Sequence, residues 1–183
     1  MSKNNPISLL RILKSPGSDF AAPLQGVKLQ RIINTWLAMH RIGTLPFDIK
    51  DDAVALLFVT SQTRGRWILP KGLAKTGETH AETCAREAFE EAGIKGQVLE
   101  DFPITVPITK QTDDGKQAVP VTYYPMLVND QSDDWPEVET RERHWALIDD
   151  SPKVAFREDI MGLVQQFEAL MPWIKEAAKQ SRS

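Results

Sequence analysis

Three glutamates stand within five consecutive positions of the chain, in the stretch CAREAFEEAGI. They are Glu87, Glu90 and Glu91, and a helix would place them on one face, because residues three and four apart are neighbours on a helix. The residue four positions after Glu87 is another glutamate rather than a compensating lysine or arginine. A divalent cation that prefers oxygen ligands would remove the repulsion between these carboxylates. The spacing therefore favours a metal site over a solvated charged face.

The segment before these glutamates, PKGLAKTGE, has the composition of an anion-binding loop. Gly72 and Gly77 permit tight backbone geometry, and Lys71 and Lys75 add positive charge. Alone this is a weak signal, since an ordinary strand-to-helix turn looks similar. Beside a divalent-metal face it indicates a phosphorylated substrate, because a metal ion can bridge carboxylate and phosphate oxygens.

The acidic segment is expected to be a helix over residues 79–92. Thr79 and Glu82 have the spacing of a capping box, in which each residue satisfies a free backbone donor of the first turn. Small apolar residues are expected to form a second face that packs on a sheet. These are Ala81, Ala85, Ala88, Phe89 and Ala92.

Apolar runs rich in β-branched residues predict strands around this helix. A buried strand is expected within 51–62, paired as a hairpin with 43–49. The other expected strands are 66–72, 97–110, 117–130 and 143–149, with a hairpin turn at Asp114-Gly115. Residues 153–180 predict helical segments that break or kink before Pro172. Together these elements predict a mixed α/β layered domain.

The first 42 residues differ in composition from the rest, so we divide the chain into 1–42 and a folded domain over 43–183. Residues 1–26 are rich in Ser, Asn, Pro and Gly and predict an N-terminal arm. Residues 27–42 repeat apolar side chains at helical spacing and predict an amphipathic helix. Its apolar stripe would pack on the domain or on a second subunit, so a homodimer is one of the two alternatives.

Length and charge restrict the class of protein. A chain of 183 residues with a net charge of -3 predicts one globular domain that does not bind nucleic acid generally through its charge. The single cysteine, Cys84, excludes an internal disulfide and favours a reducing compartment. No apolar run approaches the roughly 20 residues that span a bilayer, and the first residues do not form a secretory signal. The expected location is the cytoplasm.

The stretch 72–94 resembles the signature of the Nudix hydrolases, G-x5-E-x7-R-E-U-x-E-E-x-G-U, where U is aliphatic. The matching residues are Gly72, Glu78, Arg86, Glu87, Glu90, Glu91, Gly93 and Ile94. Ala88 is smaller than the usual aliphatic residue at its position. The flanking stretches GRWILPKG and DDWPEVETRERHWALIDDS are similar to the branch of diphosphoinositol polyphosphate and diadenosine polyphosphate phosphohydrolases. This resemblance, over about residues 43–170, implies a Nudix-type α/β/α sandwich with a mixed β-sheet.

The resemblance also implies hydrolysis of a pyrophosphate bond that depends on Mg²⁺, with Mn²⁺ as a substitute. It makes Glu87 and Glu91 metal ligands together with the Gly72 carbonyl, and Glu90 the general base or a further ligand. Glu78 and Arg86 would form a supporting ion pair between loop and helix. Family members differ in their general base, and later glutamates offer alternatives. These are Glu137, Glu139 and Glu142, for which a solvated loop is the preferred interpretation.

The phosphates of the substrate would need cationic partners outside the signature. The candidates are Arg66, Lys71, Arg141 and Arg143, with Arg64 as a weaker one. Arginine suits bidentate contacts with phosphate. Trp67 and Trp145 could stack on an adenine, although packing in the core is favoured. The three histidines form no coherent ligand set, and Cys84 has no partner for a role as nucleophile.

The resemblance favours a small phosphorylated substrate, with diadenosine polyphosphates preferred. Inositol pyrophosphates, or a nucleoside diphosphate linked to another group, are alternatives within the same enzyme class. An alternative of another class is a non-catalytic Nudix module that senses nucleotides. Such a module is expected to lose at least one of the three glutamates, and this chain keeps all three.

Overall fold

The computed structural model of the protein describes residues 40–112, 115–155 and 158–181. The predicted N-terminal arm, and residues 27–39 of the predicted amphipathic helix, lie outside the described residues. The prediction is wrong for the end of that helix, because Arg41 and Ile42 belong to the first strand of the sheet. There they pair with Val121 and Thr122 of a distant strand.

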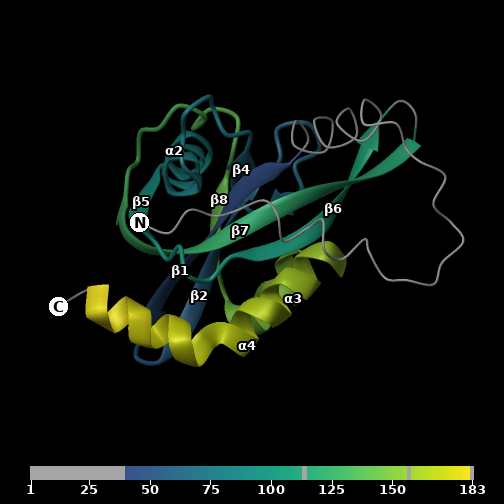
Figure 1. Ribbon diagram of the computed structural model, residues 1–183. Coiled ribbons are helices and arrows are strands. Elements are labelled where there is room, and N and C mark those ends of the chain that lie inside the picture. The colour runs from purple at the N-terminus through teal and green to yellow at the C-terminus, as the bar shows by residue number, and fades with distance from the viewer. Residues whose placement is uncertain (1–39, 113–114, 156–157, 182–183) are drawn as a thin grey trace, which may run out of the picture. The chain divides into compact units, whose positions relative to one another are not determined.

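The described residues form strands and helices in the following order (Figure 1). They are β1 (Arg41–Lys50), β2 (Ala53–Thr60), β3 (Trp67–Ile68), β4 (Lys71–Gly72), α2 (His80–Ala92), β5 (Ile94–Val98), β6 (Ile104–Thr112), β7 (Gly115–Gln131), β8 (Arg143–Leu147), the 3-10 turn η2 (Ile148–Asp150), α3 (Ser151–Val154) and α4 (Glu158–Ser181).

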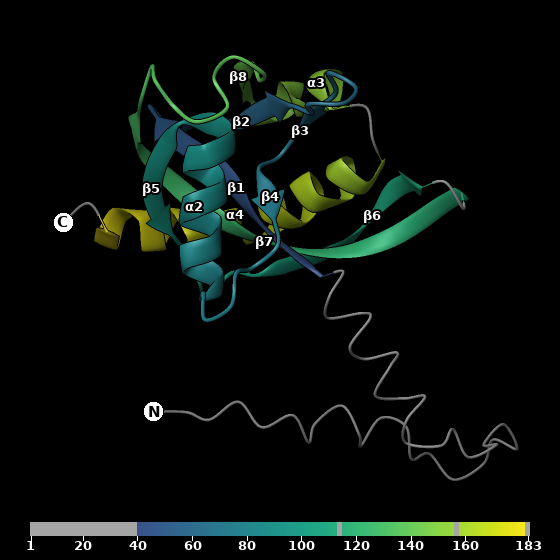
Figure 2. The ribbon, with the colours of Figure 1, turned by 90° about the horizontal axis from the view of Figure 1, so that it is seen from above.

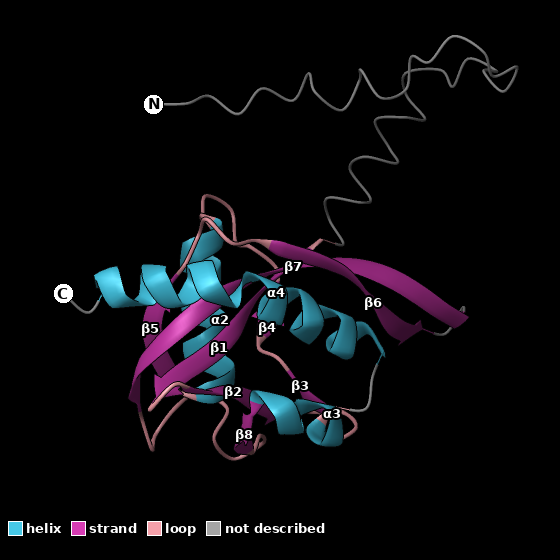
Figure 3. Cartoon of the chain, turned by 90° about the horizontal axis from the view of Figure 1, so that it is seen from below, coloured by secondary structure: helices cyan, strands magenta, loops and turns pink. Residues whose placement is uncertain are grey.

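The strands form one mixed sheet with the central order β3-β2-β1-β7-β5. In addition, β4 pairs with β1, β6 with β7 and β8 with β2. The pairing of β1 with β7 is parallel, whereas the other pairings are antiparallel. Helix α2 lies on one face of the sheet and α4 on the other, as Figures 2 and 3 show from opposite sides. The predicted α/β/α sandwich with a mixed sheet is therefore confirmed.

The central strands are buried on both faces, which explains their nearly continuous apolar sequences. Side chains alternate between the faces of a strand, and in β2 they do so between two cores. Leu56 and Phe58 belong to the core on the α4 side. Leu57 and Val59 belong to the core on the α2 side. The predicted hairpin of β1 and β2 is present, with Phe47 opposite Leu56.

Helix α4 runs without a break from Glu158 to Ser181 and includes Pro172, so a break before Pro172 is wrong, whereas the alternative of a kink there stays a prediction. A proline removes one helical hydrogen bond, but apolar residues on both sides of it hold this helix to the sheet. Phe167 and Ile174 are both fully buried in the core on the α4 side. No helix within the described ranges is long and apolar enough to cross a membrane.

Candidate active site

Helix α2 begins and ends where its own sequence provides the caps. The Thr79 hydroxyl accepts a hydrogen bond from the Glu82 backbone at 3.1 Å. The Glu82 carboxylate in return accepts from the Thr79 backbone at 2.8 Å. At the other end, Gly93 has a φ of 64° in the left-handed region, which favours glycine and closes the helix. The predicted capping box is therefore confirmed.

The face of α2 that packs on the sheet consists of Cys84, Ala88 and Ala92, all fully buried. Ala85 is exposed, so the prediction that it would pack on the sheet is wrong. The buried residues are spaced by four, and Cys84 takes the place that was predicted for Ala85. This shift brings the neighbouring Glu87 and Glu91 against the sheet, and each is only 8% exposed. The glutamate face is therefore not a solvated charged surface.

Gly72 lies directly against the carboxylate of Glu87. A Cβ atom at position 72 would be 1.8 Å from Glu87 Oε1 and 2.2 Å from its Cδ. Strand β4 holds this glycine in place, because Gly72 pairs with Ile42 of β1. Steric hindrance therefore explains why the first residue of the signature is a glycine, since any side chain there would displace Glu87.

Arg86 connects the loop before α2 to the glutamates on the helix. Its Nε and Nη2 donate to the two carboxylate oxygens of Glu78 at 2.8 and 3.0 Å. Its Nη2 also donates to the Leu73 carbonyl at 2.9 Å. Its Nη1 donates to Glu87 at 2.6 Å and to Glu90 at 3.0 Å. The ion pair expected between Glu78 and Arg86 is present, and the same guanidinium also compensates Glu87 and Glu90.

Acid should weaken the fold through Glu78, because its hydrogen bonds, first with Arg86 and then with the Lys75 backbone, lower its pKa from 4.5 to about 2. A carboxyl with a lowered pKa in the folded state stabilises the fold above its unfolded pKa. We expect this contribution to be complete above 4.5 and to be lost as the pH falls through about 2. The free energy of unfolding in urea should be measured at several pH values for the wild type and for Glu78→Gln. Plotted against pH, the two free energies should converge at low pH. Two curves that stay parallel throughout would contradict the prediction.

Glu91 is held by a different arginine. Arg141 Nη2 donates to Glu91 Oε1 at 2.6 Å, and the backbone N–H of Lys71 donates to Oε2 at 3.2 Å. Burial raises the pKa of Glu91 to about 7, although the positive charges of Arg141 and Lys71 oppose this rise. A buried carboxylate is unfavourable unless cations and donors compensate it. Here an arginine and a backbone amide compensate the charge in part, and burial still outweighs them.

The donor atoms of this face suit a hard divalent cation. Glu87 and Glu91 are buried carboxylates, and the absence of a side chain at Gly72 lets the Glu87 carboxylate lie directly against its backbone. Mg²⁺ and Mn²⁺ prefer such oxygen ligands. Within the described ranges, no group of three acidic, histidine or cysteine side chains lies close enough together to hold a metal ion. Arg86 contacts Glu87 and Glu90, and Arg141 contacts Glu91. Metal binding by these glutamates stays a prediction.

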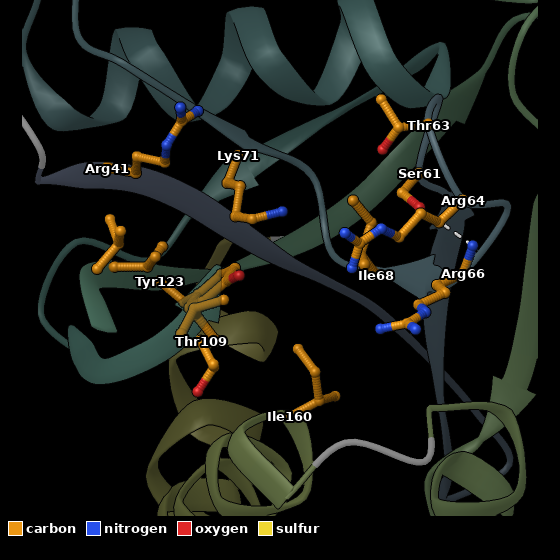
Figure 4. A pocket seen from close by; sticks show the side chains of 13 residues that line it. Arg41, Ser61, Thr63, Arg64, Arg66, Ile68, Lys71, Thr109, Tyr123 and Ile160 are labelled. Carbon is orange, nitrogen blue, oxygen red and sulfur yellow. Dashed lines mark hydrogen bonds between the residues drawn. The ribbon is translucent and has the colours of Figure 1, made fainter. Parts of the chain in front are cut away.

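A cavity of about 290 Å³ opens beside strand β4. Four cationic side chains line it, Arg41, Arg64, Arg66 and Lys71, and no acidic side chain is among the described residues of its wall. Figure 4 shows Arg41 and Lys71 on one side of the cavity and Arg64 and Arg66 across it. The rest of its wall is largely apolar, formed by Ile68, Ile108, Val119, Val121, Tyr123 and Ile160.

Two of the four predicted phosphate-binding residues, Arg66 and Lys71, therefore lie in this cavity. Arg41 is not among the predicted phosphate-binding residues, because apolar periodicity predicts an N-terminal helix that includes it. Only the parallel pairing of β1 with β7 brings Arg41 to the cavity wall. No local sequence signal could have identified it.

The structure does not bring Arg143 to the cavity. Its Nη1 donates to the carbonyls of Ala92 and Ser132, at 3.1 and 2.6 Å, and its guanidinium lies 4.0 Å from the centre of the Trp135 ring. Ala92 is the last residue of α2, so Arg143 satisfies a free carbonyl at the C-terminal end of the helix. This contact stabilises the helix end.

The two tryptophans considered for base stacking are partly buried against the cores. Trp67 packs on the α4-side core and lies 5.5 Å from the His144 ring. Trp145 packs on the α2-side core and donates to the Gln131 side chain at 2.9 Å. These contacts agree with the preferred interpretation, which was packing in the core.

Cys84 should be unreactive in the folded protein. Its thiol is fully buried and donates to the Gly43 carbonyl at 3.1 Å, and burial raises its pKa to about 12. The reactive thiolate is therefore absent near neutral pH. We expect no labelling by iodoacetamide under native conditions and complete labelling in denaturant, measured by mass spectrometry. Rapid labelling of the native protein would show that this face of α2 opens.

The chain is similar to known proteins of the Nudix family in both sequence and fold. The model of the NUDIX domain matches residues 39–164. The mitochondrial Nudix hydrolase 12 of Arabidopsis thaliana is 29% identical over 121 residues, which cover 63% of this chain and 59% of that protein. Diphosphoinositol polyphosphate phosphohydrolase 3-beta of Bos taurus is 31% identical over 119 residues, covering 62% of this chain and 67% of that protein.

Among solved structures, an Ap4A hydrolase of C. elegans superimposes with a TM-score of 0.56 at 21% identity. The match covers 72% of this chain and 97% of that one. The mixed sheet between two helices, with glutamates on the helix that follows a glycine loop, defines a Nudix-type domain. The chain belongs to the Nudix family. It spans about 59% of the length of the Arabidopsis relative.

Proposed function

We propose that the protein hydrolyses a pyrophosphate bond in a nucleoside polyphosphate-type substrate, with Mg²⁺ or Mn²⁺ at the glutamate face of α2. The observation that carries this proposal is the position of β4. Its first residue, Lys71, lines the cationic cavity, and its second, Gly72, lies against Glu87. The cavity and the carboxylates thus border the same two-residue strand, and in this proposal a phosphate chain bound in the cavity extends to the carboxylates. Membership of the Nudix family supports this assignment.

In this proposal Glu87, Glu91 and the Gly72 carbonyl hold the metal. When bound, the metal would neutralise phosphate oxygens and lower the pKa of a coordinated water. Glu90 is the candidate base, because its side chain is 38% exposed and the carboxylates of Glu87 and Glu91 are more deeply buried. Arg86 and Lys75 lie near the Glu90 carboxylate, at 3.0 and 3.7 Å, and help to orient it.

The cavity is proposed to hold the part of the substrate that extends from the cleaved bond. Arg41, Arg64, Arg66 and Lys71 would bind its phosphates, since arginine makes paired hydrogen bonds with phosphate oxygens. The apolar part of the wall suits an organic group at the end of the chain. Diadenosine polyphosphates have both features and are our preferred substrates, in agreement with the name of the C. elegans structural relative.

Inositol pyrophosphates are the second candidate. Four cations on a wall whose described residues include no acidic side chain favour a densely charged group, and the bovine relative is named for such a substrate. A nucleoside diphosphate linked to another group is a third candidate with fewer charges. A non-catalytic module that senses nucleotides is disfavoured, because Glu87, Glu90 and Glu91 are all retained.

The test is an assay of the full chain with Mg²⁺ or Mn²⁺, in which the phosphorylated products are separated and quantified by chromatography. The substrates would be diadenosine polyphosphates, inositol pyrophosphates, nucleotide sugars, ADP-ribose and deoxynucleoside triphosphates, with chelator as the control. We expect metal-dependent turnover that is fastest with diadenosine polyphosphates. Faster turnover of inositol pyrophosphates would reverse the substrate order. Tight binding without turnover of any of them would support the sensing module instead.

We also propose that the protein acts in the cytoplasm, because a single, buried cysteine suits a reducing compartment. The Arabidopsis relative is named as mitochondrial. Fractionation of the source cells with an antibody against the protein would decide between these compartments.

A further inference from the structure

Arg141 is nearly enclosed by the protein, although it lies in the segment that joins β7 to β8. Its side chain is only 7% exposed. Its Nη1 donates to the Thr60 carbonyl at 2.8 Å, and its Nη2 donates to Glu91 Oε1 at 2.6 Å. Its Nε pairs with the carboxylate of Glu137. One guanidinium thus connects the end of β2, the helix α2 and its own segment.

We propose that Arg141 is a positioning residue, which fixes the Glu91 carboxylate for a divalent metal, and that it does not bind substrate phosphate. This inference rests on the function proposed above. It replaces the sequence-based assignment of Arg141 as a phosphate ligand.

The first argument is that the hydrogen-bonding capacity of Arg141 is directed inward. A guanidinium has five N–H donors in a rigid fork, and Arg141 uses each of its three nitrogens on Thr60, Glu91 or Glu137. A phosphate would have to displace one of these partners and reach a side chain that is 7% exposed. By contrast, Arg64 and Arg66 are exposed on the turn before β3 and line the cavity. Phosphate contacts are better served by these two residues.

The second argument concerns the Glu91 carboxylate. Each of its oxygens accepts one hydrogen bond, Oε1 from Arg141 and Oε2 from the backbone of Lys71. A carboxylate oxygen has two lone pairs, so one remains on each oxygen for a metal. Groups that hold a metal ligand in this way orient it, and their loss weakens metal binding. Arg86 holds Glu87 and Glu90 in the same way, so the two arginines divide the glutamate face between them.

The positive charge of Arg141 also repels a bound cation, which opposes the positioning effect. Burial decides the balance, since Glu91 is only 8% exposed. Without Arg141, a buried carboxylate would keep a single backbone donor and would be free to turn away from Gly72 and Glu87. We therefore expect that loss of Arg141 weakens metal binding.

The test measures Mn²⁺ affinity directly, by electron paramagnetic resonance of free Mn²⁺ with the full chain. Arg141→Gln should bind Mn²⁺ about 10- to 100-fold more weakly than wild type, the range seen when groups that support metal ligands are removed. Arg141→Lys should recover part of the affinity, because an ammonium can reach Glu91 but cannot also bridge Thr60 and Glu137. The substrate KM of Arg141→Lys at saturating Mn²⁺ should equal that of the wild type.

Arg143→Gln is the matched control. It removes a comparably buried guanidinium, 13% exposed, that contacts the carbonyls of Ala92 and Ser132 and the Trp135 ring. We expect it to lower stability and to keep the wild-type affinity for Mn²⁺. If Arg141→Gln does not fold, Glu137→Gln provides the second measurement, since it frees Arg141 on one side and should weaken Mn²⁺ binding by a smaller factor.

Two results would overturn the inference while leaving the proposed function intact. One is wild-type Mn²⁺ affinity in Arg141→Gln or, where that variant does not fold, in both Arg141→Lys and Glu137→Gln. The other is a raised substrate KM at saturating Mn²⁺ with unchanged Mn²⁺ affinity, which would identify Arg141 as a phosphate ligand. A wild-type chain that binds no Mn²⁺ would instead overturn the proposed function together with this inference.

Discussion

Glu91→Gln is expected to lower the kcat of metal-dependent hydrolysis about 10²- to 10³-fold, the size that follows loss of one preorganised group that stabilises charge. The substitution keeps the shape of the side chain and removes its negative charge. Its carboxamide oxygen can still accept a hydrogen bond from Arg141, which now donates to Glu91 at 2.6 Å. The measurement is the rate of nucleotide product formation under saturating Mn²⁺, followed by chromatography, beside Mn²⁺ affinity.

Stability must be followed in the same variant, because Glu91 and Arg141 form a buried ion pair. Weakening a buried hydrogen bond to a charged group costs about 1–3 kcal/mol, so urea unfolding should show a modest loss with the sheet intact by circular dichroism. Glu168→Gln is the matched control, since it removes the charge of an exposed glutamate on α4. It should retain wild-type rate and stability. Full activity of Glu91→Gln would exclude Glu91 as a metal ligand.

Gly72→Ala is expected to lower turnover strongly while it lowers the free energy of unfolding only modestly. The new Cβ would lie 1.8 Å from Glu87 Oε1, so the carboxylate must move. Gly72 is not among the described glycines with positive φ, so the conflict is steric and not conformational. The carboxylate is the end of a flexible side chain, and overpacking of this kind costs about 1–3 kcal/mol. A displaced Glu87 should lower Mn²⁺ affinity by at least about 10- to 100-fold, and turnover with it.

The control for this variant is Gly162→Ala in α4. A Cβ at position 162 would meet no atom within 4 Å, and alanine stabilises a helix interior by about 0.5–1 kcal/mol relative to glycine. We expect slightly higher stability and unchanged turnover. If Gly72→Ala kept wild-type Mn²⁺ affinity and rate, the close contact between Gly72 and Glu87 would have no part in the chemistry.

The acidic helix was predictable because its limits depend on neighbouring residues. It was expected over 79–92 and spans His80–Ala92. The capping box of Thr79 and Glu82, and the glycine at position 93, are signals within the helix and its ends. The face that packs on the sheet was less predictable. Helical periodicity shows which residues share a face, but the sheet determines which face is buried, and for this reason Ala85 was assigned wrongly.

The two arginines of the RERHW stretch show the limit of the sequence most clearly. Arg141 and Arg143 stand two positions apart and had the same predicted role. In the structure one holds Glu91, which is 50 positions away in the chain, and the other contacts Ala92 and the Trp135 ring. Their partners depend on the pairing of β8 with β2, which brings this stretch beside α2 and the end of β2.

The sequence by itself determined the spacing of the carboxylates, the capped helix that carries them and the family to which the chain belongs. These features are local, because a helix places residues three and four apart together whatever surrounds it. Arg86 contacts Glu87 and Glu90 from within the same helix, so these contacts are local as well. Only the tertiary structure decided that Arg141 contacts Glu91 and that Arg41 joins the cavity wall. The pairing of distant strands makes these two contacts, because it brings segments that are far apart in the chain within reach of one another.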